Sequence, residues 1–384
     1  MALASYSGAG SFNQTDGTHL DLSDELSTVL LADTFLLGRI SMSGQAEAVD
    51  HYWMEDSLLT TTVTGNAAMD ASETTLTVVA NANVQIGTLL QDQTLGKQEV
   101  MQVTALTSGT AWVVTRGVGD SAPAGETHAN GALYRIIGQP KQEGDANVND
   151  NSRSRSRIHN VCQIFKKEVE VSGTIQAINL AGVPDEYNYQ LANRTLELRR
   201  ELGMSAYSSV KVTGGGAGGS DTVYRSMDGL RNFVRRQSAQ LTTTSQALTE
   251  SIVNSQYRLI YNQGGEADFA VGTADQMTYF SELYKDKIRL APSDRTRGVF
   301  VTKFLTDLGV ELDLVIDRWA LPGDLIIGDT SKLRLVPLKG RGWQATPLAK
   351  TGDAMRGMLV GEYTLEVRNA AQSFSLHSGL TARG

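Results

Sequence analysis

The sequence predicts an α+β fold, and three segments carry that prediction. Within residues 160–174, Phe165, Val169 and Val171 alternate with Lys166, Glu168 and Glu170, which indicates a half-buried strand because successive strand side chains point to opposite faces. Residues 184–207 begin with a proline and two acids and carry apolar residues along one stripe, which indicates a single amphipathic helix about 30 Å long. Residues 72–137 contain short β-type runs separated by turns, as in a small antiparallel unit.

The N-terminal segment is expected to be an arm. Residues 1–22 are rich in Gly, Ser, Asn and Thr and cannot bury enough apolar area to fold by themselves, so we expect them to become ordered on a neighbouring molecule. Short apolar pieces between Leu30 and Leu58 are expected to anchor the arm to the main body. Residues 1–26 contain no Lys or Arg and no continuous apolar block, which excludes a secretory signal or a transit peptide.

The rest of the chain follows the same mixed pattern. Residues 139–157 are polar almost throughout and are expected to form a loop or the returning limb of a hairpin. After the long helix, residues 210–230 are expected to form a strand, a flexible glycine tip and a return. Helical spacing dominates residues 248–290. Two strands are expected at 310–319 and 323–338, and residues 358–384 are expected to form a last alternating strand and a short polar tail. No internal repeat of 20 to 50 residues is apparent.

Composition bounds the class of protein. The 384 residues are 41% hydrophobic and 20% charged, with 38 glycines against 7 prolines, which indicates a globular, loop-rich chain. The net charge of -8 argues against a dedicated nucleic-acid binder, which needs clustered Lys and Arg. The single cysteine, Cys162, excludes an internal disulfide and is expected to be a small buried hydrophobe. The apolar runs are too short to cross a bilayer.

Two motifs resemble binding sites, and we reject both assignments. Gly214, Gly216 and Gly219 match GxGxxG, but no strong helix opens after them, so a flexible loop is the better interpretation. Asp145 begins a run of alternating oxygen ligands, but an EF-hand would need Gly and Glu where this chain has Asp150 and Ser156. A different kind of ion site stays open there.

The remaining chemistry-bearing residues form no recognisable constellation. The five histidines are scattered and none has zinc-ligand spacing with cysteine support. His51 and Glu55 could share a helix face, and we interpret them as a surface polar pair. No serine lies in a GxSxG elbow, and nothing pairs Cys162 with a histidine for nucleophilic catalysis. The sequence therefore predicts no catalytic residue, no cofactor-binding residue, no metal site and no cofactor.

Three segments together resemble a known family. They are QIF with EVEVSGT and the polar helix, then YRSMDGLRNFV at 224–234, then VGEYTLEVRNAAQSFSLHSGL at 360–380. In their order and spacing they are similar to the major capsid proteins of tailed bacteriophages, within these the SU10-type major head protein family. The resemblance covers most of the C-terminal two thirds of the chain.

This resemblance implies an HK97-like major capsid fold. Residues 1–56 would be an N-terminal arm and anchor, and residues 57–165 an extended E-loop that carries the small β insertion at about 72–137. The peripheral domain would be residues 166–235, with the long spine helix, and the axial domain residues 236–350. Residues 351–384 would be a C-terminal return strand of the peripheral domain. These assignments come from the resemblance and not from periodicity.

The function implied is structural. The chain would self-assemble into hexamers and pentamers of an icosahedral phage head that encloses double-stranded DNA, with a scaffolding protein and a portal as partners and no membrane. It would be made in the host cytoplasm and reside in the virion. The alternative is the shell protein of an encapsulin-like bacterial nanocompartment, which uses the same fold. A hydrolase or nucleotide-binding enzyme is a third interpretation, and the absent motifs argue against it.

One charged triplet is the candidate site. Arg153, Arg155 and Arg157 are separated by serines, so an extended chain places three cations on one side, where they suit a row of carboxylates or phosphates. A solvated loop accounts for the pattern equally well. We favour a contact with a neighbouring subunit, because an acidic shell needs local sites of opposite charge to set register.

Overall fold

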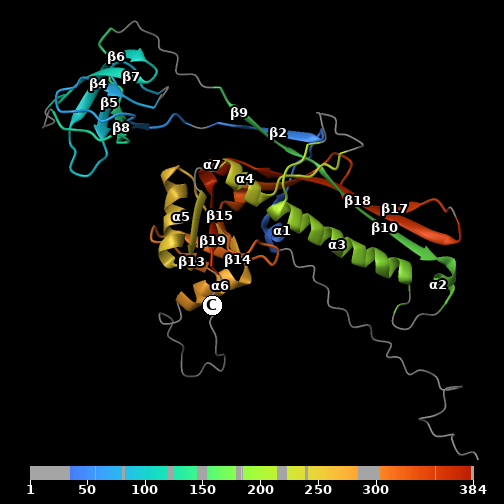
Figure 1. Cartoon of the computed structure of the whole chain (residues 1–384). Helices are drawn as coiled ribbons and strands as arrows, with labels where there is room; N and C mark the ends of the chain where they lie inside the picture. The colour runs from blue at the N-terminus through green and yellow to red at the C-terminus, as the bar shows by residue number, and fades with distance from the viewer. Residues whose placement is uncertain are drawn as a thin grey trace, which may run out of the picture. The chain divides into compact units, whose positions relative to one another are not determined.

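The structure, a computed structural model, divides into two compact units (Figure 1). Unit 1 combines Met1–Trp53 with Ile158–Gly384, and unit 2 is Met54–Arg157. The residues described are 35–56, 58–79, 83–119, 125–144, 154–178, 183, 185–213, 223–237, 241–283, 303–350 and 352–381. The predicted arm at residues 1–22 lies outside these ranges, whereas most of its predicted anchor, from residue 35 onward, lies within them.

Unit 1 contains helices and two larger sheets. Its helices are α1 (Phe35–Arg39), α2 (Gly173–Ala177), α3 (Glu186–Ser208), α4 (Leu230–Gln237), α5 (Glu250–Asn262), α6 (Ala274–Leu283) and α7 (Ala370–Ser373). The first sheet has the order β1-β16-β18-β10 with β17 also paired to β18, and its strands are β1 (Ser41–Met42), β10 (Gln163–Ser172), β16 (Leu333–Pro337), β17 (Gln344–Leu348) and β18 (Ala354–Val367). The strand predicted within residues 160–174 is thereby confirmed as β10.

The predicted long helix is also present, as α3, and it lies along β10 and β18 (Figure 1). Asp185 caps the helix, because its side chain accepts a hydrogen bond from the Asn188 backbone N–H. The helix lies close to the sheet because Gly357 on β18 has no side chain: a Cβ there would lie 2.1 Å from the Tyr187 hydroxyl. Phe165 of β10 is fully buried in this interface.

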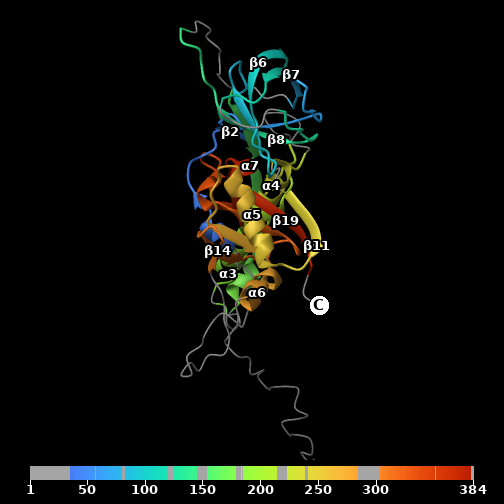
Figure 2. The same ribbon diagram turned by 90° about the vertical axis from the view of Figure 1, so that its left-hand side faces the viewer.

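The central strands of the second sheet are buried on both faces. Its order is β11-β19-β15-β12-β14-β13, and its strands are β11 (Leu241–Gln246), β12 (Phe269–Gly272), β13 (Lys303–Leu305), β14 (Glu311–Ile316), β15 (Leu325–Gly328) and β19 (Phe374–Leu380). Phe269 and Val271 face the core shared with α3 and α4, whereas Ala270 faces the core formed with α5 and α6. Figure 2 shows α5 beside β19, with which it is in contact.

Two expectations for this sheet were wrong, and a third was incomplete. The helical spacing within 248–290 is confirmed by α5 and α6, but the strand β12 between them was not expected. The strand expected at 323–338 is two strands in different sheets, β15 and β16, separated by a 3-10 turn (η1, Thr330–Lys332) that Asp329 caps. The polar tail expected after residue 369 is instead α7 and β19. β12, β15 and β19 are short strands covered on both faces, so their sequences carry little alternation.

The glycine hairpin is described only at its base. Val212 and Ser226 form an isolated antiparallel bridge, and the glycine tip between them lies outside the described residues. The bridge agrees with the predicted strand and return, although neither limb forms a longer strand in the part of the chain that the structure describes. Cys162 is fully buried and free, as expected, and burial raises the pKa of its thiol to about 12.

Unit 2 is a six-stranded antiparallel sheet that closes on itself. Its order is β3-β8-β5-β6-β7-β4, and its strands are β3 (Thr62–Thr64), β4 (Thr75–Thr77), β5 (Leu89–Asp92), β6 (Val100–Ser108), β7 (Ala111–Thr115) and β8 (Leu133–Gly138). A bridge between Gly65 and Val78 joins the two end strands, so the sheet forms a small barrel. Trp112 and Tyr134 are the largest side chains of its core. The five strands expected within 72–137 are present, and β3 is an addition.

Candidate assembly surfaces

Strands β2 (Asp50–Glu55) and β9 (Ser156–Val161) pair to form a ribbon that carries the predicted arginines. Arg155 immediately precedes β9 and Arg157 lies on it, and both are exposed. The Arg155 Nε atom is 3.9 Å from an exposed carboxylate oxygen of Asp56. Arg153 lies outside the described residues. The structure therefore places two of the three arginines at neighbouring positions of one extended segment.

The inner end of β9 is fastened to unit 1 by a buried amide. Asn160 donates from Nδ2 to the carbonyl oxygens of Asp228 (3.1 Å) and Leu365 (2.6 Å). Its Oδ1 accepts from the backbone N–H groups of Val161 and Asp228, each at 2.8 Å. Because every hydrogen-bonding group of this fully buried side chain has a partner, burial carries no unsatisfied-group penalty, and the position of β9 is well determined.

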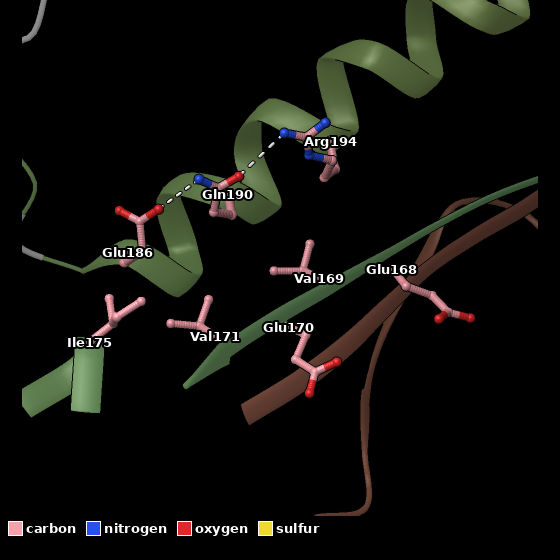
Figure 3. A pocket seen from close by; sticks show the side chains of 8 residues that line it. All are labelled: Glu168, Val169, Glu170, Val171, Ile175, Glu186, Gln190 and Arg194. Carbon is pink, nitrogen blue, oxygen red and sulfur yellow. Dashed lines mark hydrogen bonds between the residues drawn. The ribbon is translucent and has the colours of Figure 1, made fainter. Parts of the chain in front are cut away.

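A groove of about 260 Å³ lies between β10, α2 and the first turns of α3 (Figure 3). Its lining residues are Glu168, Val169, Glu170, Val171, Ile175, Glu186, Gln190 and Arg194. Val169 and Val171 point toward α3, whereas Glu168 and Glu170 point away from it at the rim. On the helix, Gln190 donates to Glu186 at 2.6 Å, and Arg194 pairs with Glu197 at 2.5 Å.

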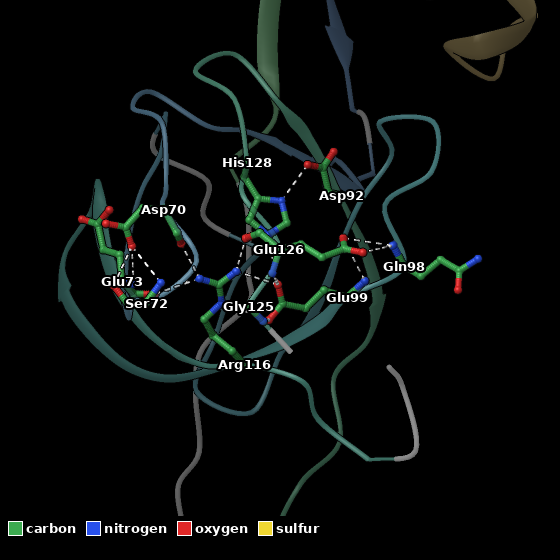
Figure 4. A network of polar contacts seen from close by, with 10 residues as sticks. All are labelled: Asp70, Ser72, Glu73, Asp92, Gln98, Glu99, Arg116, Gly125, Glu126 and His128. Atoms are coloured by element: carbon green, nitrogen blue, oxygen red, sulfur yellow. Dashed lines mark hydrogen bonds and ion pairs between the residues drawn. The ribbon is translucent and has the colours of Figure 1, made fainter. Parts of the chain in front are cut away.

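Unit 2 contains a buried ionic network that the sequence did not reveal (Figure 4). Glu99 accepts two hydrogen bonds from Arg116, from Nε at 2.9 Å and from Nη2 at 2.6 Å. It also accepts the backbone N–H groups of Gly125 (3.1 Å) and Glu126 (3.0 Å). Burial alone would raise the pKa of Glu99, but these donors and the Arg116 charge outweigh it and lower the pKa to about 2.

Arg116 connects this carboxylate to two loops. Besides its pairing with Glu99, Nη1 donates to the carbonyl oxygens of Asp70 (2.5 Å) and Glu73 (3.3 Å), and Nη2 donates to that of Glu126. All the donor groups of the guanidinium are therefore used. The pair fastens the turn at 70–73 and the segment at 125–126 across one end of the barrel.

His128 extends the network to a second acid. Its Nδ1 lies 2.7 Å from Asp92 and its Nε2 lies 3.3 Å from Glu99, and all three side chains are buried. His128 therefore lies between the two carboxyl groups and connects Asp92 to the Glu99–Arg116 pair. Burial opposes ionisation of Asp92, but hydrogen bonds from Thr94 and His128 lower its pKa overall.

Other residues singled out by the sequence have different surroundings. His51 is on strand β2, where positions 51 and 55 are separated by about 13 Å, so the expected pair with Glu55 is wrong. Its Nε2 instead lies 3.2 Å from the buried Glu366. The glycine run at 214–219 and the acidic run at 145–150 lie outside the described residues. In the described part of the chain, no His, Cys, Asp and Glu group could hold a metal ion, and no helix is long and apolar enough to cross a membrane.

Comparison with known proteins decides the family. The sequence model of the SU10 major capsid protein matches residues 8–381. The chain belongs to the SU10 major capsid protein family. It is a major capsid protein of a tailed-phage head, and the resemblance noted in its strands and long helix is confirmed. No curated protein matches this capsid protein.

Solved structures show that the capsid protein has the HK97-like fold. The capsid of cyanophage A-1(L) aligns with a TM-score of 0.51 at 12% identity, covering 97% of this chain and 99% of that one. The capsid of a native GTA particle aligns with a TM-score of 0.50 at 11% identity, covering 99% and 100%. The SrpI encapsulin of Synechococcus elongatus aligns with a TM-score of 0.42 at 14% identity, covering 60% and 80%.

Proposed function

We propose that this capsid protein forms hexamers and pentamers that close into an icosahedral head around double-stranded DNA. The observation that carries the proposal is the match of the family model to residues 8–381. A capsid subunit acts by assembly, where each interface can be modest because many of them act together in one shell. Repeated subunits of one chain are the basis of any capsid, so the protein is a homo-oligomer of the virion.

We assign parts of the fold to this role. The N-terminal arm and anchor (1–56) and the E-loop region (57–165) would reach across neighbouring subunits, and unit 2 would be the β insertion of that loop. The peripheral domain would be 166–235 with α3 as its spine helix, together with the return strand region 351–384, and the axial domain would be 236–350. The exposed arginines on the ribbon and the groove beside α3 support this assignment, because both lie where a neighbour could touch them.

Assembly in the host cytoplasm would involve a scaffolding protein and a portal. DNA would be enclosed without sequence-specific binding, since the chain has a net charge of -8 and a wall needs no basic groove. The role is structural, and no turnover is expected of the purified chain.

Negative-stain electron microscopy of the purified chain, alone and with a crowding agent, tests the proposal. Closed shells or six-fold and five-fold rings are expected, and co-expression with a scaffolding protein should raise the yield of closed heads. Persistent monomers in both settings would contradict the proposal. Closure without any helper, together with capture of a cargo peptide, would favour the nanocompartment alternative.

The arginine triplet provides a narrower test. Replacement of Arg153, Arg155 and Arg157 together by Ala should leave the far-UV circular dichroism of the chain unchanged and reduce the yield of shells. Replacement of three exposed cations elsewhere, Arg258, Lys303 and Lys339, is the matched control for the loss of charge. Equal shell yields from the two variants and the unmodified chain would show that the three arginines do not contribute to assembly.

A further inference from the structure

Strand β10 has an open edge. It pairs with β18 on one side through all ten of its residues, and among the described residues no strand pairs with its other side. Such an edge presents unpaired N–H and C=O groups that can hydrogen-bond to another extended chain. Charged side chains protect an edge from indiscriminate pairing, and β10 carries Lys166, Glu168 and Glu170 on its exposed face.

The face of this edge that carries the glutamates presents two carboxylates. Glu168 and Glu170 lie at the rim of the groove and point away from α3, whereas Val169 and Val171 point toward the helix (Figure 3). The two carboxylates therefore lie on the opposite face of β10 from the apolar floor of the groove. An extended segment with cations on one side would fit both the open edge and these carboxylates.

The ribbon carries such a segment. Arg155 and Arg157 are two positions apart on an extended chain, and so are Glu168 and Glu170 on β10. At a rise of about 3.3 Å per residue, both pairs repeat at about 6.6 Å, which lets two guanidinium groups meet two carboxylates in one register. Glu311 and Asp313 have the same spacing, but their strand, β14, lies between β12 and β13 and has no open edge.

We propose that the segment containing Arg155 and Arg157 of one copy docks along the β10 edge of a second copy, with its guanidinium groups on Glu168 and Glu170. This inference rests on the proposed function, because it requires copies of the chain to assemble. Docking adds a strand to the first sheet and places opposite charges directly across from each other. It also fixes the register between the copies, because a one-residue slip turns the arginines to the other face.

The ion pairs now present at these positions do not oppose docking. Glu168 contacts Lys166 at 2.6 Å and Glu170 contacts Arg356 at 2.7 Å, and their side chains are 60% and 55% exposed. Exposed pairs contribute little and exchange partners readily. A bidentate contact between each of these carboxylates and an arginine of the second copy is stronger than either of the present pairs.

Charge reversal and its compensation test the contact. The chains to compare are the unmodified protein, Arg155→Glu with Arg157→Glu, Glu168→Arg with Glu170→Arg, and the fourfold variant that combines all four. Far-UV circular dichroism of each chain checks that it is folded, and light scattering with electron microscopy gives the concentration at which rings or shells appear. Matched controls reverse exposed charges elsewhere, Glu47→Arg with Asp307→Arg and Arg258→Glu with Lys339→Glu.

Each double reversal should raise the concentration needed for assembly by about tenfold or more, because like charges then meet in register. The fourfold variant should return it to near the unmodified value, while the controls change it little. Unchanged assembly in either double variant would overturn the contact, and so would failure of a folded fourfold variant to recover. If the unmodified chain itself never assembles, the proposed function fails instead, so the two failures are distinguishable.

Discussion

Replacing Glu99 by Gln should open one end of the unit 2 barrel while leaving unit 1 intact. Glutamine has the shape of glutamate, but its amide nitrogen would point at donors. The amide oxygen can still accept a hydrogen bond from Arg116, whereas the amide nitrogen would face N–H groups of Arg116 and of either Gly125 or Glu126. The substitution also leaves the charge of Arg116 uncompensated in a buried site, where its side chain is only 8% exposed.

The free-energy cost of this substitution follows from the loss of the buried ion pair and, independently, from the shifted pKa of Glu99, and the two values are similar. Loss of one partner of a buried, hydrogen-bonded ion pair costs about 3–5 kcal/mol. The pKa of Glu99 falls from 4.5 to about 2 on folding, and at about 1.4 kcal/mol per pKa unit this corresponds to about 3 kcal/mol. Because the folded-state pKa is the lower one, this stabilisation is fully present above pH 4.5 and disappears as the pH falls toward 2. Asp92, whose pKa is also lowered, changes in the same direction.

Hydrogen exchange of the full chain, followed by mass spectrometry, can measure this unit by unit. Peptides from β6 and β7 in Glu99→Gln should exchange about a hundredfold faster or more at neutral pH, since every 1.4 kcal/mol is a factor of ten, while peptides from α3 and β18 should not change. Glu73→Gln is the control, because that side chain is exposed on the same barrel. Unchanged exchange in β6 and β7, or equal acceleration in both units, would refute the reasoning.

Three further predictions concern unit 1. Gly328→Ala should lower the free energy of unfolding by about 1–3 kcal/mol in urea titration, because its Cβ would lie 2.2 Å from the buried ring of Phe374, whereas Gly352→Ala, with nothing within 4 Å, should change it by less than about 0.5 kcal/mol. Cys162 should resist thiol reagents until the chain is unfolded, since burial raises its pKa to about 12; rapid labelling of folded protein would contradict this. Asn369, at φ 48°, should tolerate Gly but lose about 1–2 kcal/mol as Val, and equal thermal midpoints for the two variants would count against a left-handed requirement.

The parts of the fold that the sequence predicted are those with one buried face. In β10, Phe165 faces α3 and Glu168 faces water, so the alternation is visible in the sequence. In β19 both faces are covered: Ser375 and His377 are buried as fully as Phe374, and burial lowers the pKa of His377. A strand of this kind has no polar face, and its polar residues predicted a solvated tail instead.

The ionic network of unit 2 was missed for a different reason. Its members come from separate strands and meet only through the strand order of the barrel, which spacing along the chain does not reveal. The sequence contained one indication of the pair between Glu99 and Arg116. Glu99 immediately precedes β6 and Arg116 immediately follows β7, so the two residues lie at the same end of one hairpin. An acid and an arginine flanking a predicted hairpin would have suggested a pair.

The ion pairs that stabilise this fold are buried, whereas those available for contacts between subunits are exposed. Glu362, which is 3% exposed, is held by Arg225 at 2.5 Å and Arg341 at 2.6 Å, and removing a partner would leave a buried charge uncompensated. The exposed carboxylates of Glu168 and Glu170 lose their present partners at little cost, because water replaces them. Reversing a charge at Glu362 should therefore unfold the chain, whereas reversing charges on β10 should leave a folded subunit that assembles poorly. A capsid subunit must be stably folded before it assembles and must also present charged groups that can contact other subunits. The buried ion pairs provide the stability, and the exposed ones provide the charged groups.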